Sequence, residues 1–437
     1  MKNRLIYRGM SFFFVAILAL LFGCVSSKQY RTNYESTSNN PQSVIEETNN
    51  YTLGFVEFDD QGWLWNRKQI DTVTSRLHEK AKNEGLLIIT FVHGWKHNAD
   101  NEDGNVKMMR KVLLETVAIE KLISKKQGHA PRNIVGVYIG WRGLSENLEP
   151  FKEMSFWGRK NTAEVVGHGA VVELLTELEN LKNQSNKEYA GEITNHQRLS
   201  TKLIIIGHSF GGDIVYSATA PILAERMVEN LDPNSKPQPP KSLGDLVVLI
   251  NPAFEAARFE TIQRLAATKT FTGENCVLVV FTSKTDDATK IAFPLGRRVS
   301  TLFDTYPKEQ QGQGKANVTA VGHYSPYITY DLNVRDTDSK KKSLLTASNN
   351  VPVETSVERI LAIREQRHRT SSKTLLKDLT NTFTRCVLEP RTNCIANNPV
   401  FVVSVDSRII PNHGDIDNWI FRRFLGEFLF AFSNDNF

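Results

Sequence analysis

A serine between two glycines is the residue best suited to chemistry in this sequence. Residues 207–211 read Gly-His-Ser-Phe-Gly, which matches the pattern G-x-S-x-G of a sharp strand-to-helix turn that presents a serine hydroxyl. The aliphatic residues 203–206 before it are typical of a buried parallel strand, and residues 213–218 are suited to open a helix. Side chains two residues either side of the serine would collide in so tight a turn, which explains the glycines. We therefore predict that Ser209 is a nucleophile, held in a strained backbone conformation.

A serine hydroxyl needs an adjacent base, and two histidines are candidates for that role. His413 follows the apolar stretch 400–405 and precedes a helix predicted over 418–430. His323 follows a weaker apolar stretch but lies nearer in the chain to the carboxylates considered next. The stronger flanking strand and the helix after it favour His413 as the base. His323 is then a pocket or packing residue, and it stays an alternative.

An acid must orient the base, and a pair of neighbouring aspartates follows a late apolar stretch. Asp286 is the first carboxylate after residues 277–281, and Asp287 is the near alternative. The developing oxyanion needs two backbone N–H donors, and the position after the serine makes Phe210 one of them. We expect all these groups at the carboxyl ends of strands, where open α/β sheets bind ligands.

The surrounding pattern alternates strands with helices, which predicts α/β units and a mostly parallel central sheet with helices on both faces. A long stretch, 290–399, breaks this alternation, and we interpret it as an inserted, cap-like segment before the last strand rather than a second sheet. The expected strands cover 51–58, 86–92, 134–139, 203–206, 246–250, 277–281 and 400–405, and the expected helices 67–82, 108–123, 162–181, 418–430 and one or two between 357 and 384.

Together these features resemble the α/β-hydrolase superfamily, in particular its lipase and esterase-like members. The resemblance covers residues 51–430 outside the insertion, and it depends on the G-x-S-x-G turn, the His-Gly-Trp turn at 93–95, and the chain order Ser, Asp, His. It implies the α/β-hydrolase fold, a Ser–His–Asp triad and ester chemistry through an acyl-enzyme, with no metal or organic cofactor. It also places the second oxyanion donor at the backbone N–H of Trp95.

The N-terminus has the pattern of a targeting segment. Three basic residues precede an apolar run, 12–22, which is shorter than the roughly 20 residues that span a bilayer. The run ends in Leu-Phe-Gly-Cys at 21–24, which resembles a bacterial lipobox. We predict a lipoprotein signal peptide over 1–23, lipidation of Cys24, a polar flexible tether over 24–50 and a hydrolase domain over 51–437. An ordinary signal peptide or a short anchor is the alternative.

Composition restricts the partners. With 40% hydrophobic and 23% charged residues among 437, the chain is a folded globular protein. Three of its five net positive charges lie in the targeting segment, so the body gives no electrostatic reason to expect nucleic acid. The expected partners are a small-molecule or lipid ester and the membrane of a bacterial envelope, at its periplasmic or outer-membrane face. In that oxidising compartment Cys386 and Cys394 could form a disulfide, whereas Cys276 is expected to be buried.

Three functions therefore fit the sequence. The first is an esterase or lipase that uses Ser209, His413 and Asp286. The second is an acyltransferase that uses the same triad and passes the acyl group to an alcohol other than water. The third is a lipoprotein that keeps the hydrolase fold for binding without catalysis.

Overall fold

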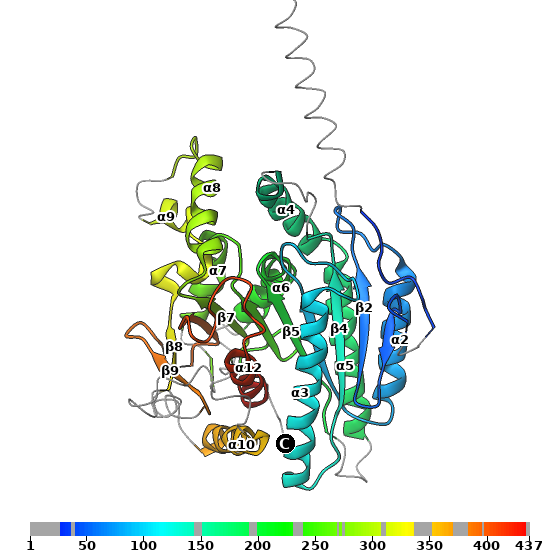
Figure 1. Cartoon of the computed structure of the whole chain (residues 1–437). Helices are drawn as coiled ribbons and strands as arrows, with labels where there is room; N and C mark the ends of the chain where they lie inside the picture. The colour runs from blue at the N-terminus through cyan, green and yellow to red at the C-terminus, as the bar shows by residue number, and fades with distance from the viewer. Residues whose placement is uncertain are drawn as a thin grey trace, which may run out of the picture.

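The computed structural model describes residues 27–35, 40–143, 151–191, 199–229, 239–268, 271–272, 276–306, 312–335, 352–369, 383–395 and 397–433. Within them, ten strands form one sheet (Figure 1). The strands are β1 (Ile45–Glu47), β2 (Tyr51–Glu57), β3 (Leu86–Val92), β4 (Asn133–Gly140), β5 (Lys202–His208), β6 (Leu246–Ile250), β7 (Leu278–Ser283), β8 (Tyr330–Val334), β9 (Cys386–Pro390) and β10 (Val400–Val405). Their order across the sheet is β1-β2-β4-β3-β5-β6-β7-β10-β8-β9.

The sheet is mostly parallel, as predicted. Among the described residues, the antiparallel neighbours are the outermost pairs, β1 with β2 and β8 with β9. All seven predicted strands are present, as β2 to β7 and β10. Their Val-, Ile- and Leu-rich sequences suit strands buried on both faces, and every residue of β3, β5, β6 and β10 is buried. We call the edge at which the parallel strands end the carboxyl edge.

Helices cover both faces of the sheet. The helices are α2 (Arg67–Ala81), α3 (Gly104–Gln127), α4 (Phe151–His168), α5 (Val171–Gly191), α6 (Phe210–Glu229), α7 (Ala256–Ala266), α8 (Phe293–Ser300), α9 (Gln313–Val318), α10 (Val353–Arg369) and α12 (Trp419–Phe432), with a π-helix η1 (Ala288–Ala292) and the 3-10 turns η2 (Val321–His323) and η3 (Ser325–Tyr327). One hydrophobic core packs α2, α5, α6 and α7 on the sheet, and a second packs α3, α10 and α12 on the opposite face. The single helix predicted over 162–181 is wrong, because α4 and α5 meet at a turn at 169–170.

The predicted insertion, 290–399, is not one separate cap. It contributes two strands to the main sheet, with β8 parallel to β10 and β9 on its outer side. Its α10 packs against α12 and α3. The strands were missed because they are short and only half-buried, with Tyr330 and Leu332 facing the core. The helices α8 and α9 stand at the carboxyl edge (Figure 1), and the turn η2 brings His323 there as well. Cys386, which begins β9, is buried and is not joined to Cys394 by a disulfide, and Cys276 is buried as expected.

The described part of the predicted tether, 24–50, is packed against the body of the protein. Arg31 is fully buried, and its guanidinium lies 3.0 Å from Glu46. The Glu57 carboxylate accepts hydrogen bonds from the backbone N–H groups of Tyr30 and Arg31. The polar composition suggested a solvated chain, but these polar groups satisfy one another beneath the surface. The prediction of flexibility is therefore wrong for these residues.

The predicted signal peptide, 1–23, and Cys24 lie outside the described residues. Among the residues that are described, no helix combines the length and the apolar character that crossing a bilayer requires.

Replacing Arg31 tests whether its packed segment stabilises the fold. We expect Arg31→Ala to lower the free energy of unfolding by about 3 kcal/mol, because it removes a buried guanidinium that bonds Glu46 and the Ala99 carbonyl and lies over the Phe55 ring. Glu46 keeps its ion pair with Arg110 in this variant. The matched control is Arg67→Ala, which breaks the exposed Arg67–Glu173 ion pair and should leave the free energy of unfolding nearly unchanged. Urea unfolding of the two variants measures both values. Equal, small losses would show that the segment behaves as a tether.

Candidate active site

Ser209 sits in a strained turn between β5 and α6. Its φ is 57°, in the left-handed region that L-residues seldom adopt, as the motif predicts. The two flanking glycines are required for space. A Cβ on Gly207 would lie 2.4 Å from the carbonyl oxygen of Gly211, and a Cβ on Gly211 would lie 2.1 Å from the carbonyl oxygen of Val92. Only glycine therefore lets strand, turn and helix approach so closely.

Three side chains from three separate strand ends meet at this turn. Ser209 follows β5, Asp286 follows β7 and His413 follows β10. The Nε2 atom of His413 lies 2.6 Å from the Ser209 hydroxyl oxygen, and its Nδ1 atom lies 2.8 Å from the Asp286 carboxylate. With Nδ1–H donating to the carboxylate, Nε2 is left to accept the serine proton. The arrangement is that of a nucleophile, a base and an orienting acid.

Asp286, and not its neighbour Asp287, is the carboxylate that contacts His413. Asp286 is fully buried, whereas Asp287 is exposed. Burial alone would raise the pKa of Asp286, but hydrogen bonds from His413 and from the Thr289 hydroxyl and N–H outweigh it and hold the pKa below its usual value. The carboxylate thus stays ionised beside the imidazole.

The alternative base, His323, lies on the other side of Thr289. Its Nε2 is 3.0 Å from the Thr289 hydroxyl, which in turn donates to Asp286. Burial lowers the pKa of His323 to about 4. His323 is therefore a neutral hydrogen-bond donor that supports the acid, while His413 is the histidine placed beside Ser209.

Two residues hold the His413 loop from beneath. The backbone carbonyl of His413 accepts hydrogen bonds from His208 Nε2 and from the Asn251 side-chain amide, each at 2.9 Å. His208 is buried, as expected for a packed residue, and burial lowers its pKa to about 3, so it stays neutral. Asn251 has a φ of 45° and is itself fixed by the backbone N–H of Ser283. No motif in the sequence predicted that His208 and Asn251 hold the His413 backbone.

The turn after β3 lies directly against the serine. A Cβ on Gly94 would be 2.7 Å from the Cβ of Ser209, so only glycine fits there. His93 anchors the turn, because its ring stacks on Trp141 at 5.7 Å and accepts the Trp141 backbone N–H. Trp141 also donates its indole N–H to the His93 carbonyl. Its buried side chain therefore braces this turn.

Both expected oxyanion donors belong to this neighbourhood. Phe210 is the first residue of α6, so its N–H has no acceptor within the helix. Trp95 follows Gly94, and no backbone hydrogen bond of its N–H is found among the described residues. Their role in binding a developing negative charge stays a prediction.

The serine hydroxyl is more enclosed than a sequence motif can indicate. Ser209 is only 1% exposed, whereas the His413 side chain keeps 22% of its surface exposed. The Gly94 turn and the imidazole cover the hydroxyl. Nearby, the buried ring of Phe156 in α4 packs against Trp95 at 5.3 Å and against Phe210 at 4.7 Å between ring centroids. The partly exposed imidazole is therefore the side from which a substrate can reach the hydroxyl.

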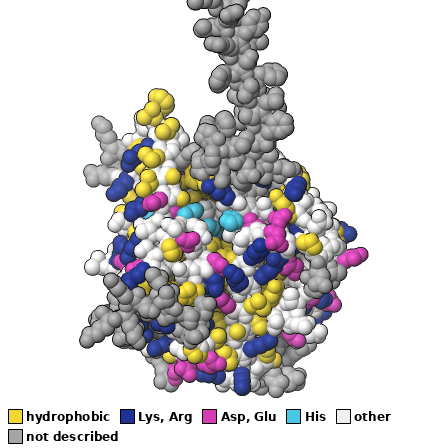
Figure 2. Space-filling model, viewed as in Figure 1, with side chains coloured by type: hydrophobic (Ala, Val, Ile, Leu, Met, Phe, Trp, Pro, Cys, Tyr) yellow, Lys and Arg dark blue, Asp and Glu magenta, His cyan; other side chains and the backbone are white. Residues whose placement is uncertain are grey.

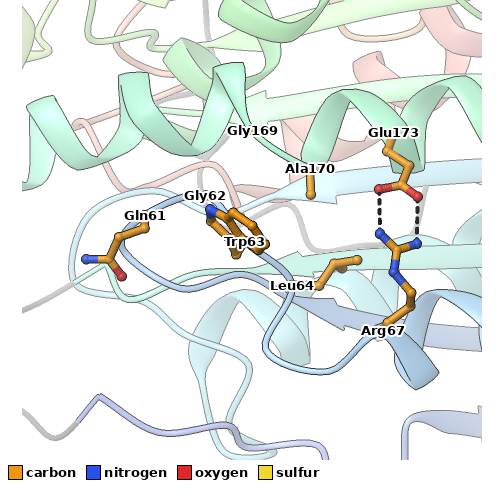
Figure 3. A pocket seen from close by; sticks show the side chains of 8 residues that line it. All are labelled: Gln61, Gly62, Trp63, Leu64, Arg67, Gly169, Ala170 and Glu173. Carbon is orange, nitrogen blue, oxygen red and sulfur yellow. Dashed lines mark hydrogen bonds and ion pairs between the residues drawn. The ribbon is translucent and has the colours of Figure 1, made fainter.

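A separate cavity of about 450 Å³ lies between the β2–α2 loop and the junction of α4 with α5 (Figure 3). Trp63 and Leu64 line it, and the ion pair of Arg67 with Glu173 closes one side. It includes none of the three residues that meet at Ser209, so it is not the candidate active site.

Comparisons with known proteins add little to this geometry. Protein-family models give no match to the chain, and no curated protein sequence matches it. Among solved structures, a cutinase from Trichoderma reesei in complex with a C11Y4 phosphonate inhibitor is similar at 14% identity and a TM-score of 0.16, over 42% of this chain and 67% of the cutinase chain. A TM-score so low supports no statement about the fold or the function of this chain, so the function has to be inferred from the site itself.

Two buried histidines and one partly buried histidine predict how the free energy of unfolding changes with pH. His93, His208 and His323 all have pKa values lowered by burial, to about 4, 3 and 4. In the unfolded chain they titrate near the usual value of about 6.5. Between these values the unfolded chain binds more protons than the folded one, so the free energy of unfolding falls as pH falls from about 6.5 to 4.

His323→Gln should reduce this slope by up to about 1.4 kcal/mol per pH unit. The measurement is urea unfolding at several pH values across that window. His78→Gln, at an exposed position of α2, is the matched control and should keep the wild-type slope. An unchanged slope in His323→Gln would contradict the assignment of a partly buried neutral imidazole.

Proposed function

We propose that this chain is an α/β-hydrolase, and that it cleaves carboxylic esters by a Ser–His–Asp triad through an acyl-enzyme. The observation that carries the proposal is the hydrogen-bonded series Ser209, His413 and Asp286, built from the ends of three strands. The strained serine and the glycine turn beside it support the same conclusion. An intact series of this kind favours catalysis over a fold retained for binding.

In the first step the Ser209 oxygen attacks the ester carbonyl carbon while its proton passes to Nε2 of His413. The carbonyl electron pair moves onto the oxygen, and the Phe210 and Trp95 N–H groups donate to that oxyanion. Asp286 holds the imidazole by its Nδ1–H and stabilises the imidazolium. The intermediate collapses as His413 returns the proton to the departing alcohol.

In the second step water attacks the acyl-serine, and His413 accepts a proton from the water. The tetrahedral intermediate collapses again, the proton passes back to the Ser209 oxygen, and the carboxylic acid leaves. His208 and Asn251 act as positioning residues, because they hold the His413 backbone where both transfers need it. An alcohol in place of water would make the reaction an acyl transfer, and no observation on the site favours that outcome.

Trp95, next to Gly94 in the turn that contacts Ser209, keeps part of its aromatic side chain exposed, whereas Phe156 is buried against it and against Phe210, which is buried as well. Apolar surface is the environment in which an acyl chain replaces water favourably. We infer a preference for esters with an apolar acyl group.

We also propose that the protein is a bacterial envelope lipoprotein with its lipid on Cys24. The support is the order of basic, apolar and small residues before that cysteine. The membrane that holds this lipid is then a partner of the protein, beside the ester substrate proposed for the triad.

The triad is tested by turnover of p-nitrophenyl esters of graded acyl length. We expect Ser209→Ala and His413→Ala each to lower kcat by roughly 10⁴-fold or more, because the two residues act as one unit. A serine-directed fluorophosphonate should label the wild type at Ser209. His323→Ala is the matched control and should keep most of the turnover. Loss of activity in His323→Ala with retention in His413→Ala would assign the base to His323.

The anchor is tested by changing Cys24 to Ser in the full chain. The variant cannot carry the thioether-linked lipid, so metabolic labelling with a fatty acid should fall to background, and the protein should leave the membrane fraction. Ester turnover per molecule should stay as in the wild type, because Cys24 precedes the described fold. Lipid incorporation that persists in Cys24→Ser would contradict the lipoprotein proposal.

A further inference from the structure

Helix α8, with the residues on either side of it, presents an apolar stripe to solvent. Five large side chains between 52% and 92% exposed form the stripe: Ile291, Leu295, Val299, Leu302 and Phe303. Leu295 and Val299 lie four residues apart on one side of α8, Ile291 precedes the helix in η1, and Leu302 and Phe303 follow it in the turn at 301–303. A helix on the surface of a globular protein normally turns such a stripe toward the core, so an outward stripe indicates something that covers it.

The opposite side of the same helix is attached to the protein. Phe293 is fully buried in the core that α6 and α7 share. Arg297 lies 2.8 Å from the buried carboxylate of Glu255 and also donates to the Asn317 backbone carbonyl. The helix is therefore oriented by its polar and buried contacts, and the apolar stripe faces outward as a consequence.

The stripe lies at the carboxyl edge, beside the candidate active site. The segment that carries it begins at η1, directly after Asp286. Figure 1 shows α8 projecting beyond the sheet at this edge. In Figure 2, hydrophobic side chains gather at the tip of that projection, and histidine side chains reach the surface below it.

The first described residues lie at the same edge. Tyr30 and Arg31 donate backbone hydrogen bonds to Glu57, the last residue of β2, which pairs with Gly140 at the end of β4. Cys24 precedes Ser27, the first described residue, by three positions, a span of roughly 11 Å at most. A lipid on Cys24 would hold the carboxyl edge within a short distance of the bilayer.

Charged residues border the stripe. Lys290 and Arg298 are exposed beside the apolar side chains, and the acidic Asp287 and Asp304 are exposed at the two ends of the segment. Apolar side chains with charged groups of both signs around them fit the interface of a bilayer, where the apolar groups enter the acyl boundary and the charged groups stay among the headgroups.

We propose that the stripe Ile291, Leu295, Val299, Leu302 and Phe303 inserts into the bilayer interface, so that the carboxyl edge and its site face the membrane. The orientation depends on the proposed anchor at Cys24, whereas the insertion of the stripe is measured without any enzyme assay. Esters dissolved in or displayed by the membrane are then the substrates nearest the site.

The test uses the full lipidated chain in vesicles that contain anionic lipid. Phe303→Cys is labelled with a nitrobenzoxadiazole fluorophore, and quenching by spin-labelled lipid is measured. Val228→Cys is the matched control, since it replaces an equally apolar residue that is 52% exposed at the far end of α6. That end lies about 27 Å along the helix from the carboxyl edge. The unsubstituted chain, labelled in parallel, corrects for the native cysteines.

We expect at least threefold stronger quenching and a blue-shifted emission at position 303, with neither change at position 228. Equal quenching at the two positions overturns the proposal. So does a sedimentation experiment in which the chain is a dimer that Phe303→Glu dissociates, because the stripe would then contact a second copy. These readouts hold whether or not the chain hydrolyses esters.

A second variant separates the membrane contact from the chemistry. Val299→Glu with Phe303→Glu should leave turnover of a water-soluble short ester within twofold of wild type and lower turnover of an ester embedded in vesicles at least tenfold. Equal effects on the two substrates overturn the proposal. Absence of turnover with both substrates in the wild type instead refutes the proposed hydrolase function, and the quenching result still decides the membrane contact.

Discussion

The site depends on close approach of backbone segments that only glycine permits. Gly207 and Gly211 let β5 turn into α6, and Gly94 lets the turn after β3 touch Ser209. A methyl group at any of these positions would meet another atom at 2.1–2.7 Å, closer than such contacts occur. The strained φ of Ser209 is thus imposed by its surroundings. The positions of His413 and Asp286 relative to Ser209 depend on these close backbone contacts.

The core strands and the three reacting side chains could be predicted because each leaves a local signal. An aliphatic run long enough for a strand, followed by a polar residue, predicts both the strand and the position of that residue at the carboxyl edge. Ser209, Asp286 and His413 all follow such runs. Parallel pairing then brings residues hundreds of positions apart together, as the 2.6 Å contact of His413 with Ser209 illustrates.

The supporting contacts could not be predicted, because they depend on pairs of residues that only the folded chain brings together. Asn251 and His208 donate hydrogen bonds to the His413 carbonyl, and no sequence motif marks these bonds. A sequence shows that an amide and a ring nitrogen are present, but it does not show which carbonyl they reach. The packed N-terminal segment was missed for a related reason. Its composition indicates solvation, but Arg31 finds buried partners in Glu46 and the Ala99 carbonyl. The short strands β8 and β9 lie in a stretch whose pattern is interrupted.

The π-helical turn η1 joins the acid of the candidate triad to α8 without an intervening loop. The Lys290 N–H bonds to the Asp286 carbonyl at 2.9 Å, and the Phe293 N–H bonds to the Ala288 carbonyl. Wide π turns of this kind are strained and recur at functional sites. Asp286 and the outward stripe therefore lie on one stretch of chain, with consecutive helical hydrogen bonds from the carboxylate residue into α8. The acid that orients His413 and the surface that we propose meets the bilayer are in this way parts of the same local structure.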